Sequence, residues 1–230
     1  MRTAALCLLL SLASTNAFAA LVLDQEYNPG SLGQVGSMTF LTGGAGDRQQ
    51  AQTFTVGVAG ELKAIEFYIF TSSTASQPLQ VELLSTVAGQ PTGSVLASAT
   101  IQQSAVPTAS QLPGPVGGYN VWGGPMTRFE FPGVAVAPGD VLAFKLKTSD
   151  PQFAYQWIVP TALNINDPPF PKYLGGYLWE KEAAEAAWQG GVFQVSGVFR
   201  TFVDVVPEPA SLALLLPAAM GIALVRRRNA

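Results

Sequence analysis

Histidine is absent from this chain of 230 residues, and the single cysteine, Cys7, lies close to the N-terminus. Without histidine there is no usual general base, no Ser-His-Asp triad and no histidine-ligated zinc. Removal of the first 19 residues, which is expected below, would also remove Cys7. The remaining chain would then have no disulfide, no thiolate nucleophile and no thiolate metal site. These absences favour a protein that is not an enzyme.

Charge is also scarce, because only 12% of the residues are charged, against about 25% in typical soluble domains. Residues 20–206 hold eight basic and fourteen acidic side chains, a net charge of −6. A net-acidic segment without Lys/Arg clusters argues against nucleic-acid binding, which requires neutralisation of phosphates. The 23 glycines and 17 prolines favour many turns and short strands.

The N-terminus has the pattern of a signal peptide over residues 1–19. Arg2 precedes a short apolar run, residues 4–10, and Ala17-Phe18-Ala19 forms an A-x-A cleavage site. We expect a signal helix that signal peptidase removes after Ala19. Lipid attachment at Cys7 is an alternative, but Leu6 stands where a small residue is needed. An uncleaved buried helix is the other alternative.

The C-terminus combines three features over residues 206–230. Pro207-Glu208-Pro209 is followed by an almost wholly apolar segment, 210–225, and then by Arg226, Arg227 and Arg228. A helix over 210–225 would be roughly 24 Å long, short of a ~30 Å hydrocarbon core, and Pro217 would kink it. The arginines should hold the extreme C-terminus in the cytoplasm. The tail therefore predicts a transmembrane helix, with the main domain outside the cytoplasm.

This tripartite tail resembles the PEP-CTERM sorting signal. The resemblance implies recognition by an exosortase, a membrane cysteine protease that is thought to cleave near the Pro-Glu-Pro motif. Proteins with this signal are exported by Gram-negative bacteria that make exopolysaccharide and biofilm. The protein would be held transiently in the inner membrane, with its domain on the periplasmic side, and would then reach the cell surface or the medium. A plain tail anchor is the alternative.

Between these ends, residues 20–205 are expected to form one all-β domain. Period-two alternation, typical of half-buried strands, occurs in 80–83, 128–131 and 142–147, and residues 62–70 resemble a central strand covered on both faces. Residues 191–204 are expected to form a long strand or hairpin. Turns are expected at 57–60, 89–93, 111–118 and 138–140. About eight to ten strands predict an antiparallel β-sandwich of jelly-roll type.

The order of these segments is similar to the jelly-roll modules of secreted bacterial surface proteins. The similarity extends over most of residues 21–204, from 23–26 and 51–60 to 137–140 and 199–203. It concerns strand and turn patterns, so it implies a fold and no activity. Residues 179–188 interrupt the pattern, because their alanines and glutamates favour a short helix that ends at Gly190-Gly191.

Aromatic residues late in the chain are candidates for a glycan-binding site. Their faces can stack on sugars, and loop-like sequence tends to display binding residues. The cluster consists of Tyr155, Trp157, Tyr173, Tyr177, Trp179 and Trp188, and the binding candidates within it are Tyr173, Tyr177, Trp179 and Trp188. The alternative is that these side chains cap the core of the sandwich, where aromatic residues contribute much of the packing energy.

Acidic residues suggest two further hypotheses. Asp24, Glu26 and Asp204 flank the first and last strands and supply the oxygen ligands that Ca²⁺ prefers, although no dense acidic loop is present. A pair chosen from Glu180, Glu182 and Glu185 could hydrolyse a glycoside without histidine, but their spacing is typical of a solvated helix face. The sequence therefore favours an exported, non-catalytic envelope or matrix protein without a cofactor. The alternatives are a carbohydrate-binding module and, more remotely, a glycoside hydrolase.

Overall fold

A computed structural model describes residues 20–28, 35–39, 48–72, 74–111, 125–150, 154–160, 173–182, 187–190 and 196–205. The chain divides into two compact units, one of which is Leu21–Asp204. The other consists of residues 1–20 and 205–230, and only Ala20 and Val205 of it are described. The expected signal peptide, 1–19, and the sorting tail, 206–230, thus lie outside the described residues.

The largest sheet has six strands, in the order β12-β11-β3-β9-β6-β7. They are β12 (Gln189–Gly190), β11 (Leu178–Glu182), β3 (Arg48–Thr55), β9 (Val141–Lys147), β6 (Leu79–Val87) and β7 (Gln90–Ile101). Each neighbouring pair in this order is antiparallel. Ala88 and Gly89, with φ values of 51° and 77°, form the two-residue hairpin turn between β6 and β7, as positive φ at both positions allows.

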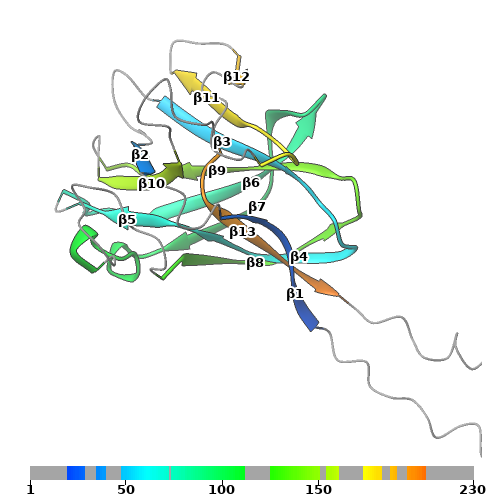
Figure 1. Ribbon diagram of the computed structural model, residues 1–230, viewed down its shortest axis with the longest axis horizontal. Helices are drawn as coiled ribbons and strands as arrows, with labels where there is room; N and C mark the ends of the chain where they lie inside the picture. The colour runs from blue at the N-terminus through cyan, green and yellow to red at the C-terminus, as the bar shows by residue number, and fades with distance from the viewer. Residues whose placement is uncertain are drawn as a thin grey trace, which may run out of the picture. The chain divides into compact units, whose positions relative to one another are not determined.

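Two smaller sheets complete the domain. One contains β1 (Ala20–Tyr27), β13 (Phe199–Val205), β4 (Gly60–Phe67) and β8 (Thr127–Val136), in that order. The other contains β2 (Val35–Thr39), β10 (Tyr155–Pro160) and β5 (Ile69–Thr71). Only Tyr68 separates β4 from β5, and its backbone bonds to Val198 and Ile158 join these two sheets into a nearly closed surface (Figure 1). The short 3₁₀ turns η1 (Gln103–Ala105) and η2 (Ala109–Gln111) follow β7.

Aromatic side chains from different sheets meet in the core. Phe144 of the six-stranded sheet packs on Phe67 of β4 at a ring-centre distance of 4.8 Å and on Phe199 of β13 at 5.1 Å. Trp157 of β10 lies against the same Phe67 and Phe144 rings, at 5.8 and 5.7 Å. Each ring removes a large apolar area from water, so this cluster holds the sheets together in a sandwich-like arrangement.

The predicted all-β, antiparallel class is confirmed. Residues 80–83, 128–131 and 142–147 lie in β6, β8 and β9, and Leu142, Phe144 and Leu146 are buried as their alternation predicts. Residues 62–70 span β4 and β5, with the break at Tyr68. The eight to ten expected strands were too few, because the described residues form thirteen, several of them only two to five residues long.

The predicted helix over 179–188 is wrong where the structure describes it. Residues 178–182 form β11, which pairs with β3 from Leu178↔Gln52 to Glu182↔Arg48, and Gln189–Gly190 form β12. Pairing with β3 satisfies the backbone N–H and C=O groups that a helix would satisfy internally. Helix propensity is a local property and takes no account of a distant strand such as β3 that offers this pairing. Residues 183–186 lie outside the described residues.

Other expectations are changed in detail. The turn expected over 89–93 is confined to Ala88–Gly89, since β7 already starts at Gln90. Within 191–204, only residues from Phe199 onward are in a strand, residues 196–198 are not, and 191–195 are outside the described set. Among the described residues, no helix is long and apolar enough to cross a membrane; the expected span, 210–225, is not among them.

Candidate functional site

Tyr173, the first of the four aromatic candidates, is directed into the domain. Its ring lies edge-on to Phe199 at 5.1 Å, and its hydroxyl donates to Gln25 Oε1 at 2.8 Å and accepts from the Thr55 backbone at 3.4 Å. Burial raises the pKa of Tyr173 to about 12. These contacts connect β1 and β13 of one sheet with β3 of another, so Tyr173 is a structural link between sheets.

Trp179 lies on the opposite side of the six-stranded sheet. Strand alternation turns Leu178 toward the core, where it is 5% exposed, and therefore turns Trp179 outward. Trp179 is half-buried, and its indole Nε1 donates to Thr53 Oγ1 at 3.3 Å. Because the same hydroxyl also accepts from the Tyr177 backbone at 2.8 Å, Thr53 fixes both the indole and the start of β11.

Gly190 sets the orientation of the Trp179 ring. It stands opposite Trp179 in the β11–β12 pair, and a Cβ at this glycine would lie 2.5, 2.6 and 2.7 Å from three adjacent atoms of the six-membered ring. An approach to the ring edge could not give three nearly equal distances, so Gly190 lies under the ring face. The indole is thus flat over β12, and its other face points away from the sheet.

Tyr177 and Trp188 extend this surface. Tyr177, two residues before Trp179 and on the same face by alternation, is 64% exposed. Trp188 is half-buried and precedes β12; the antiparallel register, continued by one residue from Glu180↔Gln189, sets it opposite Lys181 on the outward face. We call Tyr177, Trp179 and Trp188 the aromatic edge. Aromatic side chains that leave one face of a sheet in this way can stack on the apolar faces of sugars.

Two of the three calcium candidates, Asp24 and Glu26, already have protein partners. Asp24 Oδ1 accepts from the Gly57 and Val58 backbones at 2.8 Å each, and its Oδ2 accepts from the Thr201 hydroxyl at 3.2 Å. Glu26 pairs with Arg200 at 2.6 Å. Asp204 Oδ1 is buried and has no hydrogen-bond partner among the described residues. Within the part of the chain that the structure describes, no three Asp, Glu, Cys or His side chains converge on one point.

The acidic trio proposed for glycoside hydrolysis is described only in part. Glu180 lies on the inward side of β11, where its Oε1 accepts from Gln50 Nε2 at 3.1 Å. The side chain of Glu182 and the whole of Glu185 are outside the described residues. The other predicted processing residues, Ala17, Ala19, Pro207, Glu208, Pro209, Arg226, Arg227 and Arg228, are outside them as well.

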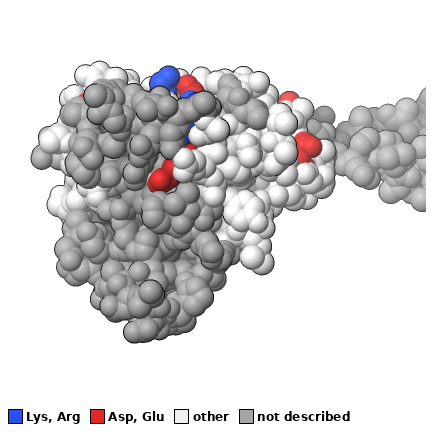
Figure 2. Space-filling model, turned by 90° about the horizontal axis from the view of Figure 1, so that it is seen from above, with Lys and Arg blue, Asp and Glu red and all other residues white. Residues whose placement is uncertain are grey.

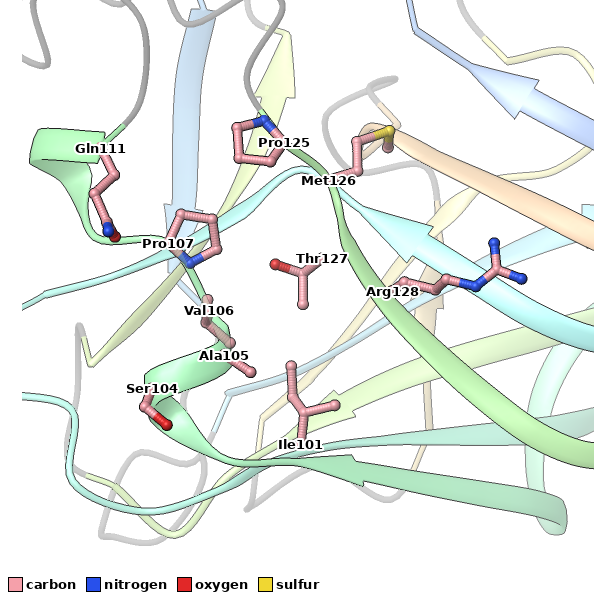
Figure 3. Close-up of a pocket in the computed structure, with 10 residues that line it drawn as sticks. All are labelled: Ile101, Ser104, Ala105, Val106, Pro107, Gln111, Pro125, Met126, Thr127 and Arg128. Atoms are coloured by element: carbon pink, nitrogen blue, oxygen red, sulfur yellow. The ribbon is translucent and has the colours of Figure 1, made fainter.

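A pocket that the sequence did not suggest lies between the η1–η2 segment and the start of β8. It has a volume of about 320 Å³ and is lined on one side by residues 104–107 and on the other by 125–128 (Figure 3). Thr127, one of the lining residues, is 4% exposed, and its hydroxyl has no hydrogen-bond partner in the part of the chain that the structure describes. Two segments about twenty residues apart form this pocket, and neither carries a recognisable motif.

Charged residues are sparse on the described part of the face seen in Figure 2. In the view from above the domain, they form a few small, separate patches on a surface that is otherwise uncharged where it is described (Figure 2).

The chain matches no known family model and no curated protein.

Proposed function

We propose that this chain is an exported, non-catalytic protein of the cell envelope or extracellular matrix, associated with exopolysaccharide or biofilm. The observation that carries the proposal is the order of the tail: Pro207-Glu208-Pro209, an apolar segment, then Arg226, Arg227 and Arg228. Signal peptidase and an exosortase would act as processing enzymes. The inner membrane would hold the chain until the tail is cleaved, and the domain would then remain at the cell surface or be released.

The position of the domain's first and last strands supports this route. β1 and β13 are neighbours in one sheet, and Gln25 N donates to Thr201 Oγ1 between them at 3.0 Å. The first residue of β1 and the last residue of β13 lie at the same end of the sheet (Figure 1). A domain whose ends adjoin can be displayed from one attachment point without distortion of its core. Adjacent first and last strands also favour the jelly-roll class within the sandwich-like folds.

Replacement of Pro207-Glu208-Pro209 by three alanines tests the proposal. The change leaves the apolar segment and the arginines intact, so membrane insertion by hydrophobicity should be unaffected. Only a protease that recognises the motif would respond to the change. We expect the parent to yield a processed form without residues 210–230 outside the inner membrane, and the variant to remain full-length in that membrane. Identical fractionation and apparent mass of both proteins would contradict the sorting proposal in favour of a plain anchor.

The aromatic edge favours a second candidate function, that of a carbohydrate-binding module. Tyr177 is largely exposed, and the indole of Trp179 is supported from below by Gly190 and held by Thr53. A ring that is already fixed loses little conformational entropy when a ligand stacks on it. The exopolysaccharide of the producing cell would be the ligand for an exported protein of this kind.

A further inference from the structure

Lys181 lies beside the aromatic edge, and no carboxylate of the described residues pairs with it. It follows Trp179 by two residues in β11, so both side chains leave the same face of the strand. It is half-buried. From Tyr177 to Lys181 the strand covers roughly 13 Å, long enough for more than one sugar ring.

The outward face of the same sheet carries an excess of positive charge. Lys145 of β9 stands opposite Ala51 of β3, and Ala51 in turn stands opposite Trp179, so Lys145 and Trp179 leave the same face of the sheet. Lys145 pairs with Glu82 at 2.7 Å. Lys147 approaches the same carboxylate at 3.5 Å. Over the described strands of this sheet, the outward charged side chains are thus Lys145, Lys147, Lys181 and Glu82. This outward face therefore carries three cations and one anion, although residues 20–206 as a whole have a net charge of −6.

We infer that the aromatic edge and Lys181 together bind an acidic polysaccharide, one whose sugar rings carry carboxylates. This inference rests on the carbohydrate-binding candidate above and specifies its ligand. The outward face of Trp179 and the exposed ring of Tyr177 stack on the sugar rings, and the Lys181 ammonium pairs with a carboxylate of a neighbouring sugar. The surplus charge of Lys145 and Lys147 attracts the polyanion over a longer range. A neutral glucan would leave Lys181 without a partner, so charge complementarity favours the acidic chain.

The test measures binding of the full-length chain, purified in nonionic detergent, to immobilised alginate, a polyuronate, and to pullulan, a neutral glucan. We expect stronger binding to alginate. Lys181→Gln should weaken alginate binding about fivefold, as expected for the loss of one exposed ion pair, and should leave pullulan binding unchanged. Trp179→Ala should weaken binding to any glycan about tenfold.

Two matched variants serve as controls. Lys63→Gln removes a lysine from the four-stranded sheet, and Val95→Ser removes an exposed apolar side chain from β7, the opposite edge of the six-stranded sheet. Neither should change alginate affinity. The thermal midpoint of every variant shows whether it is folded; because Lys181 is at the surface, its variant reports on binding even if Trp179→Ala unfolds the edge.

The outcomes separate this inference from the function on which it rests. Equal binding of alginate and pullulan, with no effect of Lys181→Gln, would overturn the acidic ligand and leave carbohydrate binding in place. Absence of binding to both glycans would overturn the acidic ligand and count against carbohydrate binding too. Equal losses in Lys181→Gln and Lys63→Gln would show non-specific attraction and would overturn the site.

Discussion

Trp157 and Trp179 show how one side chain serves two purposes in this domain. Each donates its indole N–H to an oxygen, Trp157 to Val198 O at 3.0 Å and Trp179 to Thr53 Oγ1 at 3.3 Å. Each also has a glycine against its ring. Trp157, however, is fully buried and meets aromatic rings on other strands, whereas Trp179 has one face turned away from the sheet.

The comparison indicates that the position in the sheet, more than the local contacts, separates packing from display. In β10, the neighbouring sheets enclose the ring of Trp157, and its contacts contribute to stability. In β11, near the edge of the six-stranded sheet, the strand partners support only one face of Trp179. Because both residues are tryptophan, their different positions should appear as a difference in how much each side chain contributes to the free energy of unfolding.

The largest expected effect is that of Trp157→Ala. Removal of a large buried aromatic side chain leaves a cavity and should lower the free energy of unfolding by about 3–5 kcal/mol. Trp179→Ala, which vacates a half-buried edge position, should cost about 1 kcal/mol. Denaturant unfolding of the two variants under the same conditions measures both. Equal losses would mean that Trp179 belongs to the core and would remove its role as a display residue.

Gly197 and Gly190 give the next largest contrast. A Cβ at Gly197 would lie 1.9 Å from Trp157 Cζ2, inside a core that cannot yield, so Gly197→Ala should cost about 3 kcal/mol. A Cβ at Gly190 would displace the ring of Trp179, which is only half-buried and can move more readily than Trp157. Gly190→Ala should therefore change the unfolding midpoint little but weaken glycan binding. A larger stability loss at Gly190 than at Gly197 would reverse the comparison.

Alternation predicts the core face of β9 from sequence because Leu142, Phe144 and Leu146 depend only on the two-residue period of a strand. The region 179–188 could not be predicted in that way. Its alanines and glutamates favour a helix locally, and only the open edge of β3, more than a hundred residues earlier in the chain, explains why β11 is a strand. Long-range pairing of this kind leaves no local mark in the sequence.

The candidate glycan-binding site was predicted only from the concentration of aromatic residues late in the chain. The structure separates the four candidate residues into one that packs inside the domain and three that lie on the outward face of the sheet. Tyr173 and Tyr177 are of the same residue type and lie four residues apart, yet the first packs on Phe199 and the second is 64% exposed. The glycine under Trp179 and the threonine that holds its N–H come from other strands, so sequence reasoning had no means to connect them. The pocket at Thr127 was missed for the same reason.

Two buried carboxylates extend the comparison to pH: Asp150, which has neutral hydrogen-bond donors, and Glu82, which has charged partners. Asp150, 1% exposed, accepts from Ser76 N and Oγ at 2.8 and 2.7 Å and from Gln77 N at 2.8 Å. Burial alone would raise the pKa of Asp150, but these hydrogen bonds outweigh it and lower the pKa below its ordinary value. The carboxylate therefore stabilises the fold above the unfolded-state pKa, near 3.8, and this contribution is lost as the pH falls through the lower folded-state pKa.

We expect Asp150→Asn to cost about 2 kcal/mol at pH 7 and to be much less destabilising, relative to the parent, at pH 2. Urea unfolding at both pH values measures this difference. Glu82 provides the control. Burial raises its pKa, but its hydrogen bonds and charge pairing with Lys145 and Lys147 outweigh this and lower the pKa overall. Its stabilising effect should decline in high salt, whereas that of Asp150 should persist. Equal salt sensitivity of Asp150→Asn and Glu82→Gln would contradict this assignment.

Tyr177→Ala should have the smallest effect on stability and is for that reason the sharpest test of the aromatic edge. The side chain is 64% exposed, so its removal should change the free energy of unfolding by less than about 0.5 kcal/mol. The backbone bonds that fix the segment, Thr53 N to Tyr177 O at 2.9 Å and Tyr177 N to Thr53 Oγ1 at 2.8 Å, do not involve the ring. Leu174→Ala, which removes another highly exposed apolar side chain from the same turn, serves as the control. If the two variants bind alginate as well as the parent does, Tyr177 is only an exposed aromatic residue; selective loss in Tyr177→Ala, with stability unchanged, separates display from packing in a single substitution.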